Sequence, residues 1–422
     1  MNSITENISG RTEGNGRLTR QEVSWVLYDV GNSAFTMMVS TIIPIYLDVL
    51  AEGTAADYLA IWSYAVSAAT LISAVIGLIM GGLSDHRGLR KPIFAATVLI
   101  GALFCGFMGF AGSWQIYLIV FIIARILYSN SLVLYDSMLP DVTTPERMDR
   151  VSSGGYALGY IGSCIPFIAA LILVLFYKQL GLTLTAAMAI AFCITAAWWA
   201  LMSVPLLISY KQTHYAKEGG RPVAESFERL LSTFRKVRDQ KHIFLFLLAF
   251  FFYIDGVYTI IDEASAYGTA LGIDSSGLLI ALLVTQFVAC PCSILFGRLT
   301  DRVDVRKLIR ICVIAYLGIT IYAVFMQNLA QFFGLAIAVG VFQGGVQALS
   351  RSYYARLIPS AMSGEYFGLY DICGKGASFM GTTLVGLISK VTGSISLGVG
   401  AIAIIFIIGL LLFEYSGKFQ RA

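Results

Sequence analysis

Charged residues are scarce in this chain of 422 residues: they make up 13% of it, against 57% for hydrophobic residues, and the mean hydropathy is +0.77. In water-soluble domains charged residues alone account for about a quarter. The composition therefore excludes a water-soluble globule. Twelve apolar stretches of roughly 20 residues each are long enough to cross a hydrocarbon core of about 30 Å. They lie near 22–50, 58–82, 92–111, 115–134, 151–177, 182–208, 243–264, 275–297, 308–326, 330–350, 365–389 and 394–414.

Histidine is also scarce, and the three residues, His86, His214 and His242, all lie in polar segments between these stretches. This position excludes a histidine-based metal site or proton relay inside the membrane. The seven cysteines lie in apolar stretches, without the spacing of zinc sites or of a disulfide framework, and indicate small apolar side chains. A nucleophile–base pair, a phosphate-binding loop and a nucleotide-binding fingerprint are missing as well. We therefore expect no enzyme, no metal and no cofactor.

The polar first 21 residues contain no short apolar core with a cleavage site, so we expect no signal peptide and take the first apolar stretch as the targeting signal. An alternating path from a cytoplasmic N-terminus assigns 25 of the 29 Lys and Arg residues to cytoplasmic segments, and only Lys178 and Lys390 to external ones. The positive-inside rule then predicts a multi-pass plasma-membrane protein with both termini in the cytoplasm. The net charge of +4 results from the excess of Lys and Arg in these cytoplasmic segments, and it does not indicate nucleic acid as a partner.

One motif occurs twice, 216 positions apart, each time after the second apolar stretch of its half. The copies run from Gly81 to Lys91 and from Gly297 to Lys307, with Gly, Leu, Asp and a closing Arg-Lys pair in register. The chain is therefore expected to consist of two related halves. We divide it into a cytoplasmic tail (1–21), a six-helix bundle (22–208), a cytoplasmic linker (209–242), a second six-helix bundle (243–414) and a C-terminal tail (415–422). Within the linker, the helical spacing of 227–238 predicts an amphipathic helix on the lipid surface.

The repeated motif resembles the cytoplasmic loop signature of the major facilitator superfamily, G-x-L-x-D-[RK]-x-G-x-[RK]-[RK]. The resemblance implies that Asp85 and Asp301 each hold a neighbouring helix end when the transporter is open outward. Two positions depart from the signature, because His86 replaces Arg or Lys and Asp304 replaces Gly. Ordinary basic loops are the alternative, which accounts for Arg and Lys but not for the Gly-x-Leu-x-Asp before them. The predicted gate residues are Asp85, Arg90, Lys91, Asp301, Arg302, Arg306 and Lys307.

A second resemblance covers segments in both halves: 25–35, 155–162, 342–359 and 368–375. They are similar to the vacuole-effluxer-like branch of the superfamily, which takes its name from fungal autophagy-related vacuolar proteins and has bacterial members. The resemblance implies secondary transport, with amino-acid efflux proposed for the fungal members. It also implies a twelve-helix, all-α membrane fold of two pseudo-symmetric six-helix bundles with a central site near the midplane.

Polar residues within the apolar stretches predict the substrate and proton pathway, because a charge there costs about 2.5–3.5 kcal/mol and should face the protein interior. We expect Arg125 to need a carboxylate partner, with Asp29 and Asp255 the first candidates. Asp371 and Lys375 are spaced to pair on one helix face. Purely structural ion pairs are the alternative for Arg125 and for this last pair. The predicted pathway residues are Asp29, Asn32, Arg125, Asp255, Gln343, Gln347, Asp371 and Lys375.

Together these features predict a monomeric transporter that moves a small polar or zwitterionic solute by alternating access. Asp255 is expected to carry a coupling proton, because no histidine is available inside the membrane. An exporter of lipophilic drugs or lipids is the alternative, for which the 49 Phe and Tyr residues leave room. A non-transporting receptor or scaffold is a third reading, although nothing resembling a signalling domain is attached.

Overall fold

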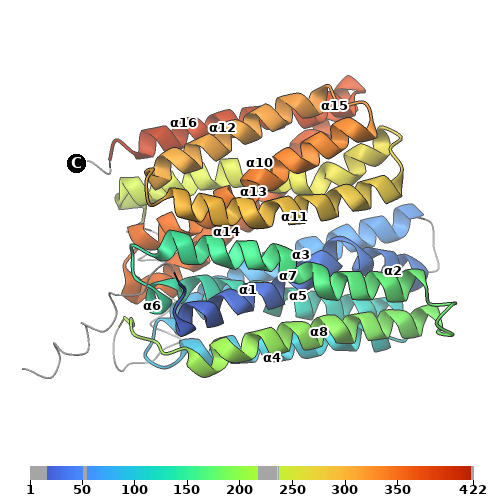
Figure 1. Cartoon of the computed structure of the whole chain (residues 1–422), viewed down its shortest axis with the longest axis horizontal. Coiled ribbons are helices and arrows are strands. Elements are labelled where there is room, and N and C mark those ends of the chain that lie inside the picture. The colour runs from blue at the N-terminus through green and yellow to red at the C-terminus, as the bar shows by residue number, and fades with distance from the viewer. Residues whose placement is uncertain (1–16, 51–54, 217–234, 236, 420–422) are drawn as a thin grey trace, which may run out of the picture.

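The structure, a computed structural model, describes residues 17–50, 55–216, 235 and 237–419. All secondary structure in these residues is helical, and the long helices lie side by side in one bundle (Figure 1). The first half contains α1 (Arg20–Ser40), α2 (Ile42–Leu50), α3 (Ala55–Ser84), α4 (Arg90–Phe107), α5 (Trp114–Ser137), α6 (Leu139–Val142), α7 (Met148–Leu175) and α8 (Leu184–Ser209). The second contains α10 (Lys241–Ala270), α11 (Ser275–Leu299), α12 (Val305–Val324), α13 (Leu329–Leu357), α14 (Ser363–Thr392), α15 (Ile395–Gly400) and α16 (Ile402–Ser416).

These helices account for the twelve predicted crossings. The first crossing is α1 followed by α2, with a break at Thr41, and the twelfth is α15 followed by α16. Within the described residues, ten helical segments are long and apolar enough to span a membrane. Large apolar side chains lie on the outside of the bundle, including Leu71, Phe110 and Leu201, each about two-thirds exposed or more. Such a surface fits lipid rather than water.

Helix ends follow local sequence. α1 begins with a capping box, in which Thr19 accepts a hydrogen bond from the Glu22 amide and Glu22 accepts one from the Thr19 amide. α13 continues to Leu357, beyond the end at residue 350 that the hydropathy predicts, because its last turns are buried in protein rather than in lipid. This extension places Arg351 inside a helix and not in a loop.

The two halves meet where α3 packs on α14 and where α7 packs on α11 and α13. Glycines allow the close approach, since a Cβ atom at Gly81 would lie 2.3 Å from the carbonyl oxygen of Gly364. We call one end of the bundle the basic end: it holds the two motif loops, α6 and the C-terminus (Figure 1). The amphipathic helix predicted for 227–238 lies largely outside the described residues, as do 1–16 of the N-terminal tail.

Candidate functional site

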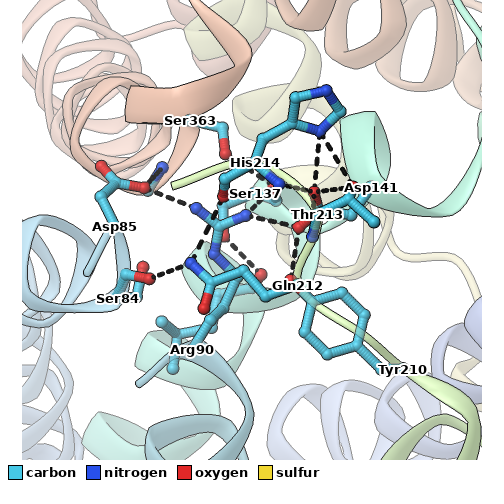
Figure 2. A network of polar contacts seen from close by, with 12 residues as sticks. Ser84, Asp85, Arg90, Ser137, Asp141, Tyr210, Gln212, Thr213, His214 and Ser363 are labelled. Carbon is cyan, nitrogen blue, oxygen red and sulfur yellow. Dashed lines mark hydrogen bonds and ion pairs between the residues drawn. The ribbon is translucent and has the colours of Figure 1, made fainter. Parts of the chain in front are cut away.

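Asp85 of the first motif lies between the two halves at the basic end. Its carboxylate accepts hydrogen bonds from the amides of Gly364 (2.8 Å) and Glu365 (2.9 Å), in the first turn of α14. It also forms an ion pair with Arg90 at 2.5 Å (Figure 2). A carboxylate at a helix N-terminus satisfies free amides and complements the helix dipole. Asp85 therefore ties the first half to the start of a helix of the second half.

Arg90 is completely buried and holds this loop from within the first half. One of its nitrogens donates to the Ser137 carbonyl oxygen at 3.0 Å and to Asp141 at 2.9 Å. Asp141 in turn accepts from Tyr210 at 2.5 Å and from the Thr213 hydroxyl at 2.7 Å (Figure 2). A guanidinium shared by two carboxylates fixes the geometry of the loop through charge-assisted bonds.

The beginning of the linker, Tyr210 to Ala216, forms a strap over the first motif. Gln212 donates to the Ser84 carbonyl oxygen (3.0 Å) and accepts from the Gly88 amide (2.9 Å). The Ala216 amide donates to the Asp85 carbonyl oxygen at 2.8 Å. His214 contributes its amide and its ring to Asp141 (Figure 2). The strap thus fixes the motif loop through backbone contacts on both sides of Asp85.

The two carboxylates of this network differ in how well they are compensated. Burial raises the pKa of Asp85, and Arg90 with the two α14 amides offsets this only in part. Burial acts on Asp141 in the same direction, but Arg90, Tyr210 and the strap residues outweigh it and lower the pKa of Asp141. The charged form of Asp141 is therefore well stabilised within its half and stays bound there. Burial of the Asp85 charge is only partly offset, so the contact of Asp85 with α14 is weaker and is broken more easily.

The second motif makes no comparable set of polar contacts with the opposite half in the described structure. The Asp301 side chain is 61% exposed, and its nearest cation is Arg150 of the first half at 4.0 Å. In the part of the chain that the structure describes, Asp301 meets no helix N-terminus, contrary to our expectation. Arg306 turns away from it and donates to the Tyr353 hydroxyl (2.8 Å) and the Phe413 carbonyl oxygen (2.6 Å).

Three of the other predicted gate residues lie at the surface. Arg302 and Lys307 are exposed, and their side chains form no ion pair with the described residues. Lys91 is half-buried and reaches the Ile208 carbonyl oxygen at 3.4 Å. Among the described residues, none of the three side chains forms a hydrogen bond or ion pair with the opposite half, so the polar contact of the motifs between the halves rests mainly on Asp85.

Further contacts between the halves surround Asp85 at the basic end. Arg356 of α13 binds Asp149 of α7 through two nitrogens, each at 2.8 Å. Asp149 also accepts from Ser352 at 2.5 Å, and Ser363 donates to the Ser137 carbonyl oxygen at 2.9 Å. These bonds join the halves, so the structure is closed at the basic end.

Arg351 of α13 forms the most buried ionic cluster between the halves. Its guanidinium lies 3.0 Å from Asp136 and 3.4 Å from Asp29, and it donates to the Ser152 hydroxyl at 2.9 Å. Sequence reasoning missed Arg351 and Asp136, because hydropathy placed both just beyond the ends of apolar stretches. The signal that would have found them is the length of the helices on either side of them.

Our expectation for Arg125 is wrong. Among the described residues it forms no ion pair, and its guanidinium lies 5.9 Å from the centre of the Tyr128 ring. Of the two expected partners, Asp29 binds Arg351 instead, and Asp255 lies inside the second half, where it accepts from the Gly381 amide.

The remaining pathway residues lie in three separate places. Asp371 and Lys375 do pair with each other, and Lys375 also donates to Ser73 of α3 at 3.2 Å, across the halves. Gln347 accepts from Tyr160 of α7 at 3.3 Å, again across the halves. Gln343 lines a small cavity between α10, α11 and α13.

Asn32 and Asp255 occupy the interiors of their own halves. Asn32 donates to Asp29 at 3.2 Å and to the Tyr28 carbonyl oxygen at 3.1 Å. Asp255 is fully buried at the middle of α10, and its second carboxylate oxygen has no hydrogen-bond partner among the described residues. The same residues contain no group of three or more His, Cys, Asp or Glu side chains that would hold a metal ion.

Comparison with known proteins identifies the family. The sequence profile of the family described as "Vacuole effluxer Atg22 like" matches residues 52–421. A Bacillus subtilis protein named "Uncharacterized MFS-type transporter YxiO" is 40% identical over 407 residues, which cover 94% of this chain and 95% of YxiO. The chain belongs to the Atg22-like family. Autophagy-related protein 22-1 of Aspergillus fumigatus, a more distant relative, is 22% identical over 79% of this chain and 70% of its own length.

Solved structures give the fold of this Atg22-like protein. FucP, a major facilitator superfamily transporter in an outward conformation, superposes with a TM-score of 0.71 at 12% identity, covering 94% of this chain and 98% of FucP. A bacterial homologue of ferroportin in an outward-facing state gives a TM-score of 0.66 at 13% identity, covering 94% and 99% of the two chains. This Atg22-like chain is therefore a multi-pass membrane protein with the major facilitator fold.

Proposed function

We propose that this Atg22-like protein moves a small polar or zwitterionic, amino-acid-like solute by alternating access. The observation that carries the proposal is that polar side chains of opposite halves meet between them. Arg351 meets Asp29, Lys375 meets Ser73 and Tyr160 meets Gln347. Such groups are costly to bury in a membrane unless they bind one another or a polar solute. A solute with its own charges can replace these contacts when the halves separate.

The positive-inside rule supports the basic end as the cytoplasmic one, with both termini inside and the protein in the plasma membrane. Closure at this end then corresponds to a transporter that is closed towards the cytoplasm. We infer that a single chain is the working unit, since both halves of the central site come from the same polypeptide.

A coupling proton on Asp255 is the second element of the proposal. An ionised carboxylate whose second oxygen has no donor is costly in a dry interior, whereas a protonated one is not. Thr259, one turn further along α10, is also buried and is the hydroxyl that lies beside this carboxylate. One proton moving through 100 mV supplies about 2.3 kcal/mol, roughly a fifty-fold concentration ratio, without nucleotide.

The test begins with a thermal-shift screen of purified protein against amino acids, dipeptides, sugars and organic anions, because a ligand that binds the folded state raises apparent stability. The best solute is then used in proteoliposomes with an imposed pH gradient. Asp255→Asn is expected to abolish gradient-driven accumulation and to spare counterflow exchange. Asp239→Asn, which changes an exposed carboxylate just before the same helix, is the matched control and is expected to accumulate normally. Accumulation by Asp255→Asn at the wild-type level would rule out the proton role.

A lipophilic solute is the alternative, although the apolar cavity in the second half is too small to hold a drug-sized molecule. A cavity of about 40 Å³ within the second half is lined mainly by apolar side chains. They include Ile260, Ile261, Leu282, Phe332 and Leu335. The same thermal-shift screen extended to hydrophobic drugs separates the two functions, since stabilisation by drugs alone would favour the lipophilic exporter.

A further inference from the structure

The guanidinium of Arg351 is enclosed by aromatic rings of the opposite half. Its central carbon lies 4.4 Å from the centre of the Tyr156 ring, 4.7 Å from that of Trp25 and 5.4 Å from that of Tyr135. The Trp25 and Tyr135 rings are stacked on each other, with centres 4.2 Å apart. Three ring faces around one cation form an aromatic cage of the kind that proteins use to bind organic cations.

Two carboxylates complete this cage, which consists of Trp25, Asp29, Tyr135, Asp136 and Tyr156. All five residues belong to the first half, on α1, α5 and α7, whereas the occupant belongs to α13 of the second half. The Arg351 side chain is only 3% exposed. The two carboxyl groups share one guanidinium, so a single cation serves both of them.

The Tyr135 hydroxyl belongs to the same cage. It is buried, and the Asp29 carboxylate is the acceptor beside it. Gly155 allows α7 to approach both groups closely, since a Cβ atom there would lie 2.6 Å from a carboxylate oxygen of Asp29 and 3.2 Å from the Tyr135 hydroxyl oxygen. The hydroxyl and the carboxylate therefore add a polar wall to the three aromatic rings, which suits the headgroup of an organic cation.

Alternating access separates cage and occupant, because they belong to different halves. When the basic end opens, Arg351 leaves with α13 and the cage keeps two carboxylates without a cation. Unpaired carboxylates in a largely buried site are costly, so a cation that enters replaces the lost partner favourably. We propose that the vacated cage binds the guanidinium or ammonium headgroup of the solute, and that Arg351 competes for this site as a tethered substitute. This inference rests on the proposed transport function and assigns the class of its solute.

The decisive experiment empties the cage without opening the transporter. Full-length Arg351→Ala is purified, and its thermal unfolding is measured with ethylguanidinium and with ethylurea, a neutral molecule of nearly the same shape. Ethylguanidinium at saturating concentration is expected to raise the unfolding midpoint by about 2–4 °C, and ethylurea is expected to have no effect. The shift is expected to disappear in Arg351→Ala/Asp136→Asn.

Arg306→Ala is the matched control, because Arg306 also stacks on rings, Tyr353 and Phe413, but binds only neutral oxygens. It is expected to give no ethylguanidinium shift. An equal shift with ethylurea, a shift that survives Asp136→Asn, or no shift in folded Arg351→Ala would overturn the proposal.

Asp85→Asn provides a second variant, in which Arg351 is retained and the basic end is expected to open. The ethylguanidinium shift is expected here and absent in wild-type protein, which tests withdrawal of Arg351 without removing it. If Arg351→Ala does not fold, absence of the shift in Asp85→Asn refutes the proposal by itself. Proton coupling through Asp255 is measured separately, so its failure leaves these binding results unchanged.

Discussion

The two copies of the repeated motif have nearly the same sequence but different roles in the structure. In the first copy, Asp85 is 1% exposed and binds two amides of α14 and the buried Arg90. In the second, the Asp301 side chain is 61% exposed, 4.0 Å from Arg150, and Arg306 binds other partners. The inter-half grip of the motifs is therefore one-sided.

Close packing of a glycine against the opposite half, in contrast, occurs in both copies. A Cβ atom at Gly81 would lie 2.3 Å from the Gly364 carbonyl oxygen, and one at Gly297 would lie 2.7 Å from Ser153 of α7. Both glycines thus permit a close crossing between the halves. Both copies of the motif therefore keep a close crossing of helices, but only the first copy binds a helix end of the opposite half through its aspartate.

The departure from the family signature at Asp304 fits this difference. Gly88 has a φ of 78°, a left-handed conformation that favours glycine, and the strap residue Gln212 binds its amide. Asp304 stands at the equivalent place with a φ of −53° and instead caps α12 by accepting from the Arg306 amide. The second loop therefore turns directly into its helix.

The largest expected difference between the copies is in the two arginines. Arg90→Gln leaves Asp85 and Asp141 buried without their shared cation, and breaking a buried pair from one side costs about 3–5 kcal/mol. Arg306→Gln loses bonds to neutral oxygens at a half-buried site, at about 1–2 kcal/mol. Thermal unfolding in detergent should show a clearly lower midpoint for Arg90→Gln. Equal midpoints for the two variants would contradict the one-sided network.

Replacing Gly81 or Gly297 with alanine should lower stability by a similar amount. Only the loss at Gly297 should be reversed by a second substitution. Gly81→Ala and Gly297→Ala are each expected to lower stability by about 1–3 kcal/mol, because a methyl group has no room. The obstacle at Gly297 is the side chain of Ser153, whereas the obstacle at Gly81 is backbone. In a Ser153→Gly background the cost of Gly297→Ala should therefore vanish, as measured by unfolding midpoints. A cost that persists there would mean that the two crossings are not constrained as described.

The smallest expected effect is a pH dependence. The pKa of Asp141 is lower in the folded protein, so the stabilisation by its charged form is fully present above the unfolded value of about 3.9. It is lost only as the pH falls through the lowered pKa. In a His214→Gln background, which removes the histidine ring that contacts Asp141, the stability deficit of Asp141→Asn should therefore stay constant from pH 8 to pH 5. A deficit that shrinks within this range would show that the charged form of Asp141 is not stabilised in this way.

Much of the fold was predictable from the sequence, because apolar length and charge asymmetry act over whole segments. The twelve crossings, the all-helical membrane fold and the family resemblance are confirmed. Helix ends were harder to predict, because hydropathy reports contact with lipid. The last turns of α13, up to Leu357, are buried in protein instead. For this reason Arg351 was counted among loop charges.

Pairing between buried charges was the least predictable feature. The i,i+4 spacing of Asp371 and Lys375 indicated their contact, because both lie on one helix. The partner of Asp29 is 322 positions away, and spacing carries no information on which helices meet. We expected Asp29 or Asp255 as the partner of Arg125 because both lie in the first helices of their halves, but helix packing brings Arg351 of α13 to Asp29 instead.

The most direct test of the one-sided grip is the distance between the halves at the basic end. Spin labels at the exposed positions Thr144 and Lys307, in a background with all seven cysteines replaced by alanine, report this distance by double electron–electron resonance. Asp85→Asn weakens charge-assisted bonds worth about 1.5–3 kcal/mol, so the longer distance should gain about ten- to hundred-fold in population. Asp301→Asn should leave the wild-type distribution unchanged. Equal opening by both variants, or by Asp301→Asn alone, would contradict the account.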